Sequence, residues 1–309
     1  MTLAAVFPGQ GAQSVGMLSE LAAAFPSVKL RFEEAGDAIG ENLWHLAQEG
    51  PAEDLSATQI TQPILLTAAV AVWEVWQQRS GQLPDFVAGH SLGEYSALAC
   101  AGALSFNDAV KLVRLRGELM EQAVPRGQGA MAAIMGLEDQ QVVDICAATE
   151  GVVVAANFNA PGQVVIAGAA APVEQACINC KDAGAKRALP LDVSGPFHSP
   201  LMEAAKDEFG QALESTSLSM PQVPIVQNVS ADVAPDLERL KANLLAQISA
   251  PVLWTQCVSK MVDLGVDHFV ECGPGNVLAG LIKRISRPTP TQSLATPAGI
   301  ETATELTRS

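Results

Sequence analysis

One serine between two glycines constrains this chain more than any other feature. The run Gly-His-Ser-Leu-Gly at 89–93 follows a short apolar stretch at 86–88 and precedes a helix-forming stretch at 92–101. Strand, sharp turn and helix in this order form a nucleophile elbow, in which a strained turn leaves room only for glycine two positions either side of the serine. The pattern predicts that Ser91 lies exposed at a helix N-terminus, where free N–H groups stabilise an oxyanion. A glycine-serine loop without function is the alternative.

Ser91 needs a general base, and the chain has four histidines. His90 is excluded because neighbouring side chains at such a turn diverge. His198 lies in a loop bracketed by glycine and proline at 194–200, at a junction between two predicted domains, and such junctions favour clefts. We therefore expect His198 to be the base, with a surface-loop histidine as the alternative. His268, in or beside a buried strand, is the second candidate.

The order of predicted elements indicates two domains. Residues 127–198 alternate as strand, helix, hairpin, helix and strand, which is the βαββαβ order of a small ferredoxin-like domain. We expect it to be inserted into a large α/β-hydrolase-like domain with a parallel sheet, formed by residues 1–126 and 199–309.

Within the large domain, a strand at 2–7 leads into a glycine-rich turn, where a backbone N–H near Gln10 is a candidate second oxyanion donor and a plain tight turn is the alternative. Pro63 is expected to begin a strong core helix. We also expect a strand at 223–226. After residue 288 the composition predicts one short edge strand and a loosely held tail.

Arg116 interrupts the apolar stripe of a predicted helix at about 107–124. At about 100° per residue, apolar side chains fall on one stripe of this helix, charged ones fall opposite, and Arg116 lies in the middle of the stripe. A buried guanidinium is costly unless an anion pairs with it. Its partner is either a core carboxylate of this chain or a substrate carboxylate held by a bidentate fork. Periodicity alone does not decide between them.

Composition excludes several function classes. The chain has 309 residues, and its net charge of −15 argues against nucleic-acid binding. No signal peptide is expected, and the longest apolar run, at 64–73, is too short to span a membrane, so we expect a cytoplasmic protein. Six scattered cysteines are typical of reduced thiols in that compartment. Cys177 and Cys180 have neither a second pair nor a nearby histidine, and we expect no metal and no cofactor.

The same residues resemble a known family over most of the chain, from Phe7 to about Ile285. The motifs that carry the resemblance are Phe7-Pro8-Gly9-Gln10-Gly11, Gly89-His90-Ser91-Leu92-Gly93-Glu94-Tyr95, Arg116-Gly117, Phe197-His198-Ser199-Pro200-Leu201-Met202, Gln247 with Pro251-Val252 and Trp254, and Gly273-Pro274-Gly275. In combination they resemble the malonyl-CoA:acyl-carrier-protein transacylases of bacterial type II fatty-acid synthesis.

This resemblance implies an acyltransferase that works by a ping-pong mechanism. Ser91 attacks the malonyl thioester, coenzyme A leaves, and the phosphopantetheine thiol of acyl carrier protein then attacks the malonyl-serine ester. His198 takes the serine proton and returns it to the leaving thiol. A backbone carbonyl near Gln247 orients the imidazole in place of a carboxylate. The backbone N–H groups of Leu92 and Gln10 are the implied oxyanion donors.

The resemblance also implies the selectivity and the partners. Arg116 matches the family arginine that pairs the free malonyl carboxylate, and acetyl-CoA leaves that buried cation unpaired. Phe197 resembles the residue of malonyl-selective members and should narrow the space for an α-methyl branch. Malonyl-CoA and acyl carrier protein are both acidic, so on a chain of charge −15 they should meet basic clusters at 283–287 and 186–187. We expect a monomer.

Rival functions use the same residues. A serine hydrolase would pass the acyl group to water, and turnover of malonyl-CoA without a thiol acceptor at the rate of transfer would favour it. A non-catalytic docking module for acyl carriers would keep the elbow unused, and labelling of Ser91 by an acyl donor would exclude that function. Malonyl loading for polyketide assembly stays open beside fatty-acid synthesis.

Overall fold

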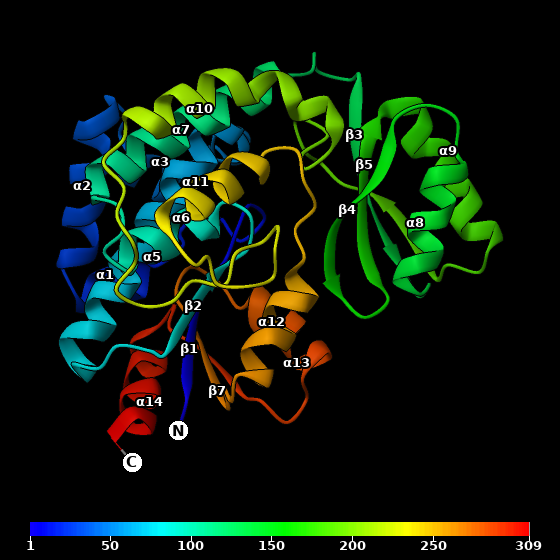
Figure 1. Ribbon diagram of the computed structural model, residues 1–309. Coiled ribbons are helices and arrows are strands. Elements are labelled where there is room, and N and C mark those ends of the chain that lie inside the picture. The colour runs from blue at the N-terminus through cyan, green and yellow to red at the C-terminus, as the bar shows by residue number, and fades with distance from the viewer. Residues whose placement is uncertain (309) are drawn as a thin grey trace.

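The structure is a computed structural model that describes residues 1–308 and contains two separate four-stranded sheets (Figure 1). The first sheet is parallel and has the strand order β2-β1-β7-β8. Its strands are β1 (Leu3–Phe7), β2 (Phe86–Gly89), β7 (His268–Glu271) and β8 (Thr291–Ser293). The register pairs Phe7 of β1 with Gly89 of β2, so the strand that leads to Ser91 ends beside the end of β1.

Alternate residues of β1 belong to two different cores. Ala5 and Phe7 pack in the larger core, whereas Ala4 and Val6 pack in a second core on the other face. Because side chains alternate along a strand, a strand buried on both faces is a continuous apolar run, as residues 3–7 are. The sheet is therefore the middle layer between helices, the usual arrangement for a parallel sheet.

The surrounding helices belong to one or the other face. Helices α5, α6 and α7 contribute to the larger core, and α12 and α13 contribute to the second. The helices outside the second sheet are α1 (Ser19–Ala24), α2 (Ser27–Ile39), α3 (Leu43–Glu49), α4 (Ala52–Ser56), α5 (Thr58–Ser80), α6 (Gly93–Cys100), α7 (Phe106–Gln122), α10 (Lys206–Ser215), α11 (Leu237–Ala246), α12 (Trp254–Asp263), α13 (Val277–Ile285) and α14 (Pro297–Arg308), with a 3-10 turn at Pro200–Ala205. None of the helices within residues 1–308 has both the length and the apolarity of a membrane span.

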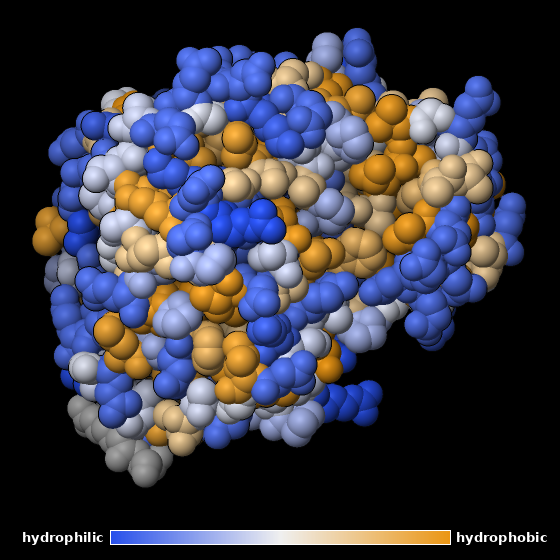
Figure 2. All heavy atoms as spheres, viewed as in Figure 1, coloured by the Kyte–Doolittle hydropathy of each residue, from blue (hydrophilic) through white to orange (hydrophobic). Residues whose placement is uncertain are grey.

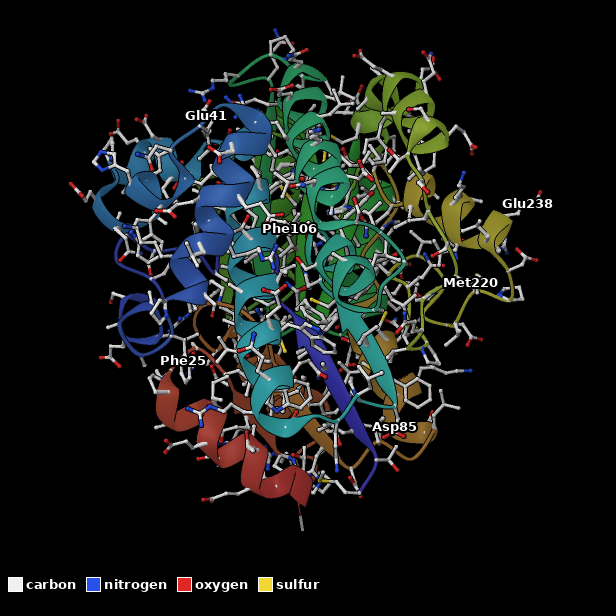
Figure 3. The ribbon with its side chains drawn as sticks, turned by 90° about the vertical axis from the view of Figure 1, so that its left-hand side faces the viewer. Phe25, Glu41, Asp85, Phe106, Met220 and Glu238 are labelled. Atoms are coloured by element: carbon white, nitrogen blue, oxygen red, sulfur yellow. The ribbon has the colours of Figure 1, made fainter. Side chains whose placement is uncertain are left out.

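Side-chain contacts fix the ends of two of these elements, and Figure 3 labels one residue of each contact, Asp85 and Phe106. Asp85 lies at the start of β1, where its Oδ2 accepts a hydrogen bond from the N–H of Leu3 at 2.8 Å. Phe106, at the start of α7, lies under the guanidinium of Arg31 from α2, at 4.7 Å from the ring centroid. These contacts hold β1 and the helix that carries Arg116 in place.

The second sheet is antiparallel and lies to one side of the first in Figure 1, with the order β4-β5-β3-β6. Its elements are β3 (Gly129–Met135), α8 (Asp139–Ala148), β4 (Val153–Ala160), β5 (Gln163–Ala169), α9 (Ala170–Asp182) and β6 (Arg187–Pro190). They follow the predicted order of strand, helix, hairpin, helix and strand. The two helices and the sheet share a small core of their own, which includes Ile134, Val142 and Ile166.

The start of the core helix differs from the prediction. Helix α5 begins at Thr58, and Pro63 lies inside it. Proline has no N–H and is therefore common in the first turn of a helix, so the sequence predicted a helix that begins at Pro63. In the structure Ile60 and Thr61 are buried, and the Thr61 hydroxyl donates to the carbonyl of Leu55 at 2.6 Å. Burial of this segment therefore outweighs the backbone hydrogen bond that Pro63 cannot donate.

The predicted strand at 223–226 is reduced to a short contact with β2. Ile225 forms an isolated parallel bridge with Val87, and the N–H of Val87 donates to the carbonyl of Pro224 at 2.9 Å. Pro224 has no N–H with which to extend the ladder. The segment thus follows the edge of β2 without forming a regular strand.

The end of the chain corrects the expectation of a loosely held tail. The short edge strand is present as β8, but α14 follows it and packs against α5 and β8. Ile300 and Ala303 are buried in the larger core, and Thr304 and Thr307 are buried beside them. The spacing of 300, 303, 304 and 307 is that of one helix face, a signal that the proline- and threonine-rich composition obscures.

Replacing Ile300 should destabilise the whole protein, because its side chain is 1% exposed and belongs to the larger core. Ile300→Ala is expected to lower the free energy of unfolding by about 3 kcal/mol, measured by chemical denaturation. Glu301→Ala, at an exposed position of the same helix, is the matched control and should leave the midpoint unchanged. Equal midpoints for the two variants would show that α14 does not belong to the folded core.

Candidate active site

The turn between β2 and α6 has the geometry of a nucleophile elbow. Ser91 adopts a φ of 51°, in the left-handed region that few residues other than glycine occupy. The two flanking glycines are required by space. A Cβ on Gly89 would lie 1.9 Å from the backbone carbon of Gly93, and a Cβ on Gly93 would lie 2.0 Å from the carbonyl oxygen of Phe7. The backbone of the turn therefore requires glycine at positions 89 and 93, and it exposes the side chain of Ser91.

Ser91 and His198 meet although 107 positions separate them in the sequence. The Oγ of Ser91 lies 2.7 Å from Nε2 of His198, and Nδ1 of His198 lies 2.8 Å from the backbone carbonyl oxygen of Gln247. A carbonyl only accepts, so Nδ1 carries the proton and Nε2 is free to accept from the serine. His268, the second candidate, instead bonds to Asp267 and takes no part in this pair.

Burial and a nearby positive charge keep His198 neutral. Its side chain is buried, and removal from water lowers the imidazole pKa most strongly. The guanidinium of Arg116 lowers the pKa further, to about 3, although the carbonyl of Gln247 acts in the opposite direction. A neutral imidazole with a free Nε2 is the form that accepts a proton from Ser91.

Arg116 projects from α7 to the pair, and its partners are neutral. Its Nη1 donates to Oε1 of Gln62 at 2.9 Å, and its Nη2 donates to Oε1 of Gln247 at 3.0 Å and to Oγ of Ser91 at 3.3 Å. The guanidinium also lies over the ring of Tyr95, 5.3 Å from its centroid. Within residues 1–308, no carboxylate lies within ion-pair distance of Arg116, and its Nε has no hydrogen-bond partner. The core-carboxylate alternative therefore finds no direct partner.

Leu92 and Gln10, the residues expected to supply the oxyanion donors, both lie at the cavity that contains Ser91. Leu92 directly follows the serine and is the N-cap residue of α6, and Gln10 follows the end of β1. In the part of the chain that the structure describes, neither N–H donates to another residue. Two free donors at the mouth of an elbow are what a developing oxyanion requires.

These groups line one cavity of about 160 Å³ between the two sheets. The second sheet supplies Asn157 and Asn159 from β4, and Phe197 lies on the segment that returns from it. His90 turns away from Ser91, and its Nε2 lies 2.7 Å from Oδ1 of Asn159. Figure 2 shows apolar residues at the surface where the second sheet, with α8 and α9, meets the larger part of the molecule. Larger hollows, such as one of about 750 Å³ beside α2 and α3, contain none of the predicted site residues.

Cys177 and Cys180 lie in α9, away from this cavity. Burial raises the pKa of Cys180 to about 11, so its thiol stays protonated in the small core. Within residues 1–308, no group of three or more His, Cys, Asp or Glu side chains is placed to hold a metal ion.

Three residues around the site were given no role in the sequence analysis. Asn228 holds the elbow, because its Oδ1 accepts from the N–H of Ser91 at 2.7 Å and its Nδ2 donates to the carbonyl of Gly89 at 2.6 Å. Gln62 is the partner of Arg116 on α5, and Glu94 is a buried carboxyl next to the elbow. The signal for Gln62 and Glu94 was a polar side chain in an otherwise apolar helix, the same signal that revealed Arg116.

Comparisons with known proteins show the family of the chain. The family described as "Acyl transferase domain" matches residues 5–299. A malonyl CoA-acyl carrier protein transacylase of Salmonella typhimurium is 51% identical over 300 residues, which are 96% of this chain and 97% of that protein. Among solved structures, an acyl carrier protein S-malonyltransferase of Vibrio cholerae is 50% identical with a TM-score of 0.95, covering 98% of this chain and 100% of its own.

A second solved structure is a complex of a type II PKS acyl-carrier protein with its malonyl-transacylase. It is 47% identical with a TM-score of 0.97, and the match covers 99% of this chain and 100% of that one. An α/β fold with a serine and a neutral histidine in one cavity is typical of enzymes that form an acyl-serine ester. The chain belongs to the acyl transferase family and, within it, to the malonyl CoA-acyl carrier protein transacylases.

The low pKa of His198 predicts an unusual pH dependence. Because the folded state holds the pKa at about 3, the base stays neutral well below the usual histidine value. The rate of Ser91 acylation should therefore stay nearly constant from about pH 8 down to about pH 5. The measurement is the initial rate of adduct formation with malonyl-CoA as a function of pH. A fall in rate centred near about pH 6.5 would contradict a buried, neutral His198.

Proposed function

We propose that the chain transfers the malonyl group from malonyl-CoA to the phosphopantetheine thiol of acyl carrier protein through a malonyl-serine ester, and so supplies fatty-acid elongation. One observation carries the proposal: Nη2 of Arg116, which has no carboxylate partner within residues 1–308, lies 3.3 Å from the Oγ of the serine that pairs with a neutral histidine. A nucleophile and a buried cation at this distance fit an acyl group with a second, free carboxylate.

The first half of the reaction forms the ester. Ser91 Oγ attacks the thioester carbonyl while His198 Nε2 accepts the serine proton, and the carbonyl of Gln247 steadies the charged ring through Nδ1–H. The N–H groups of Leu92 and Gln10 receive the negative charge that develops on the carbonyl oxygen. The carbon–sulfur bond then breaks, and the thiol of coenzyme A leaves with the proton from His198.

The second half runs the same steps with the carrier thiol as nucleophile. His198 accepts the proton of the phosphopantetheine thiol as its sulfur attacks the malonyl-serine ester. The bond to Ser91 breaks, the serine recovers the proton, and malonyl thioester leaves on the carrier. Each half begins and ends with a neutral His198, which is the state that burial favours.

The arginine explains the choice of acyl group. The malonyl carboxylate displaces neutral amide contacts and pairs with Arg116, whereas an acetyl group leaves the guanidinium with only the oxygens of Gln62 and Gln247. Phe197 is buried at 7% exposure and lines the same cavity. We propose that Phe197 narrows the space beside the malonyl methylene and disfavours an α-methyl branch.

Carrier docking is proposed for the basic clusters at 283–287 and 186–187, since carrier and coenzyme A are acidic and the chain has a net charge of −15. Arg284, at the end of α13, bonds to Gln163 and to the carbonyl of Pro161 at the hairpin between β4 and β5. This places one cluster where the second sheet meets the first. The structural likeness to a malonyl-transacylase with a type II PKS carrier makes malonyl loading for polyketide assembly the second candidate function.

We propose the following organisation for the chain that performs this reaction. Residues 1–126 and 199–309 form an α/β-hydrolase-like domain, supported by the parallel sheet and the elbow, and residues 127–198 form an inserted ferredoxin-like domain. The separate small core and the antiparallel order β4-β5-β3-β6 support the insertion. The six free cysteines support an enzyme of the cytoplasm, and we propose that it acts as a monomer.

Intact mass after brief incubation with malonyl-CoA should show one malonyl adduct, which moves to holo acyl carrier protein when the carrier is added. Ser91→Ala should abolish the adduct, because no other residue of the cavity replaces the serine as nucleophile. Loss of the adduct to water as fast as to the carrier would favour a hydrolase. A protein that forms no adduct at all would be a docking module.

Arg116→Ala should remove the preference for malonyl-CoA over acetyl-CoA. The loss of one buried charge pair predicts a fall of about 100-fold or more in the ratio of the two acylation rates. Arg114→Ala is the matched control two positions earlier, where the arginine pairs with Glu118 on the helix surface. An unchanged ratio in Arg116→Ala would mean that another group reads the carboxylate.

A further inference from the structure

Glu94 is a buried carboxyl that the proposed reaction leaves unused. It follows Gly93 at the start of α6, and its side chain is 1% exposed. In the described residues, no cation pairs with it at ion-pair distance. A carboxyl group without water or a direct cation must be held by hydrogen-bond donors. The identity of those donors indicates what Glu94 does.

Three donors surround Glu94. Its Oε2 accepts from the backbone N–H of Asn228 at 2.8 Å and from Nε2 of Gln247 at 2.9 Å, and its Oε1 accepts from Nε2 of Gln227 at 3.1 Å. An ionised carboxylate is the side chain that only accepts, so it satisfies all three donors at once. The surroundings of Glu94 therefore require a side chain that only accepts hydrogen bonds, and a polar side chain that also donates would not satisfy them.

The contact with Gln247 fixes which way that amide points. Its Nε2 also donates to the carbonyl of Ser91 at 3.1 Å, while its Oε1 accepts from Nη2 of Arg116 at 3.0 Å. An amide turned by half a rotation would set its oxygen against the carboxylate of Glu94 and its NH₂ against the guanidinium. Both of these contacts repel, because guanidinium only donates and carboxylate only accepts.

We propose that Glu94 is a positioning residue for acyl-group selectivity. By accepting from Nε2 of Gln247, Glu94 directs Oε1 of Gln247 at Arg116 and so holds the guanidinium beside Ser91. This inference rests on the proposed malonyl transfer, in which Arg116 reads the free carboxylate. Glu94 touches neither the substrate nor the reacting atoms, and it acts through Gln247.

Glu94 is also linked to the nucleophile elbow through Asn228, and this second set of hydrogen bonds would affect the acylation rate rather than the choice of acyl donor. The N–H of Asn228 donates to Glu94, and the side chain of Asn228 holds both Ser91 and Gly89. Loosening these hydrogen bonds lowers the reactivity of the serine toward every acyl donor by the same factor. Loosening the hydrogen bond to Gln247 changes the choice between donors. The ratio of malonyl to acetyl acylation therefore reports positioning, and the absolute rates report the elbow.

The test compares initial rates of Ser91 adduct formation with malonyl-CoA and with acetyl-CoA in the full-length protein. Glu94→Ala should lower the malonyl-to-acetyl ratio by about tenfold or more, because Gln247 loses the acceptor that orients it. Glu94→Gln should lower it less, by about threefold, because its oxygen still accepts from Gln247 while its NH₂ meets another donor.

Glu271→Gln is the matched control. Glu271 is also a fully buried glutamate, but its oxygens accept from the backbone N–H groups of Leu278 and Ala279 at the start of α13. Its substitution should leave the malonyl-to-acetyl ratio at the wild-type value even if the protein becomes less stable.

A double-mutant cycle tests whether Glu94 acts through Gln247. In a Gln247→Ala background, Glu94→Ala should change the ratio no further. A ratio that stays at the wild-type value in Glu94→Ala would overturn the inference, and so would a further change in the Gln247→Ala background. If Glu94→Ala does not fold, an unchanged ratio in Glu94→Gln has the same consequence. Absence of a malonyl adduct on the wild-type protein would refute the proposed function instead.

Discussion

Among the described residues, no carboxylate pairs with the buried guanidinium of Arg116, and this determines how the rest of the site is built. Arg116 is 1% exposed, lines the cavity, and makes its contacts with amide and hydroxyl oxygens. Burying such a charge is unfavourable, so the rigid helix α7 and the packing around it must hold it there. Burial lowers the pKa of His198 most, and the charge of Arg116 lowers it further. In the proposed reaction, one buried cation therefore both binds an anionic acyl group and helps to keep His198 neutral.

The partners of this cation are the neutral side-chain amides of Gln62 and Gln247, which leave the guanidinium able to pair with a carboxylate. A direct ion pair between Arg116 and a glutamate would occupy the guanidinium and compete with the malonyl carboxylate. The chain instead sets Gln247 between Arg116 and Glu94, so the carboxyl group of Glu94 lies near the guanidinium without contacting it. Burial raises the pKa of Glu94 to about 7, while the donors of Asn228 and Gln247 and the charge of Arg116 act against the rise. Arg116 and Glu94 are thus linked through the side chain of Gln247 and do not contact each other directly.

The sequence predicted the parts of the site that depend on local backbone geometry. The glycines at 89 and 93 specify the elbow, and the Gly- and Pro-bracketed loop specifies where the chain turns back with His198. Asn228 could not be found in this way, because it reaches the elbow only through tertiary contacts from an irregular segment. The predictions for the start of α5 and for a loosely held tail at α14 were wrong for a related reason. In both segments, burial of apolar side chains outweighed the tendency of proline to end or exclude a helix.

Both members of the Ser91–His198 pair have a strained backbone. Ser91 and His198 both have positive φ, at 51° and 58°, and each such residue costs roughly 1 to 3 kcal/mol. Strain of this kind persists only where the surrounding structure fixes the backbone from both sides. The end of β2 and the start of α6 do this for Ser91, and the return of the chain from the second sheet, with the carbonyl of Gln247 behind the ring, does it for His198. Leu92 beside Ser91 and Phe197 beside His198 both pack in the larger core, so this one core holds the pair at 2.7 Å.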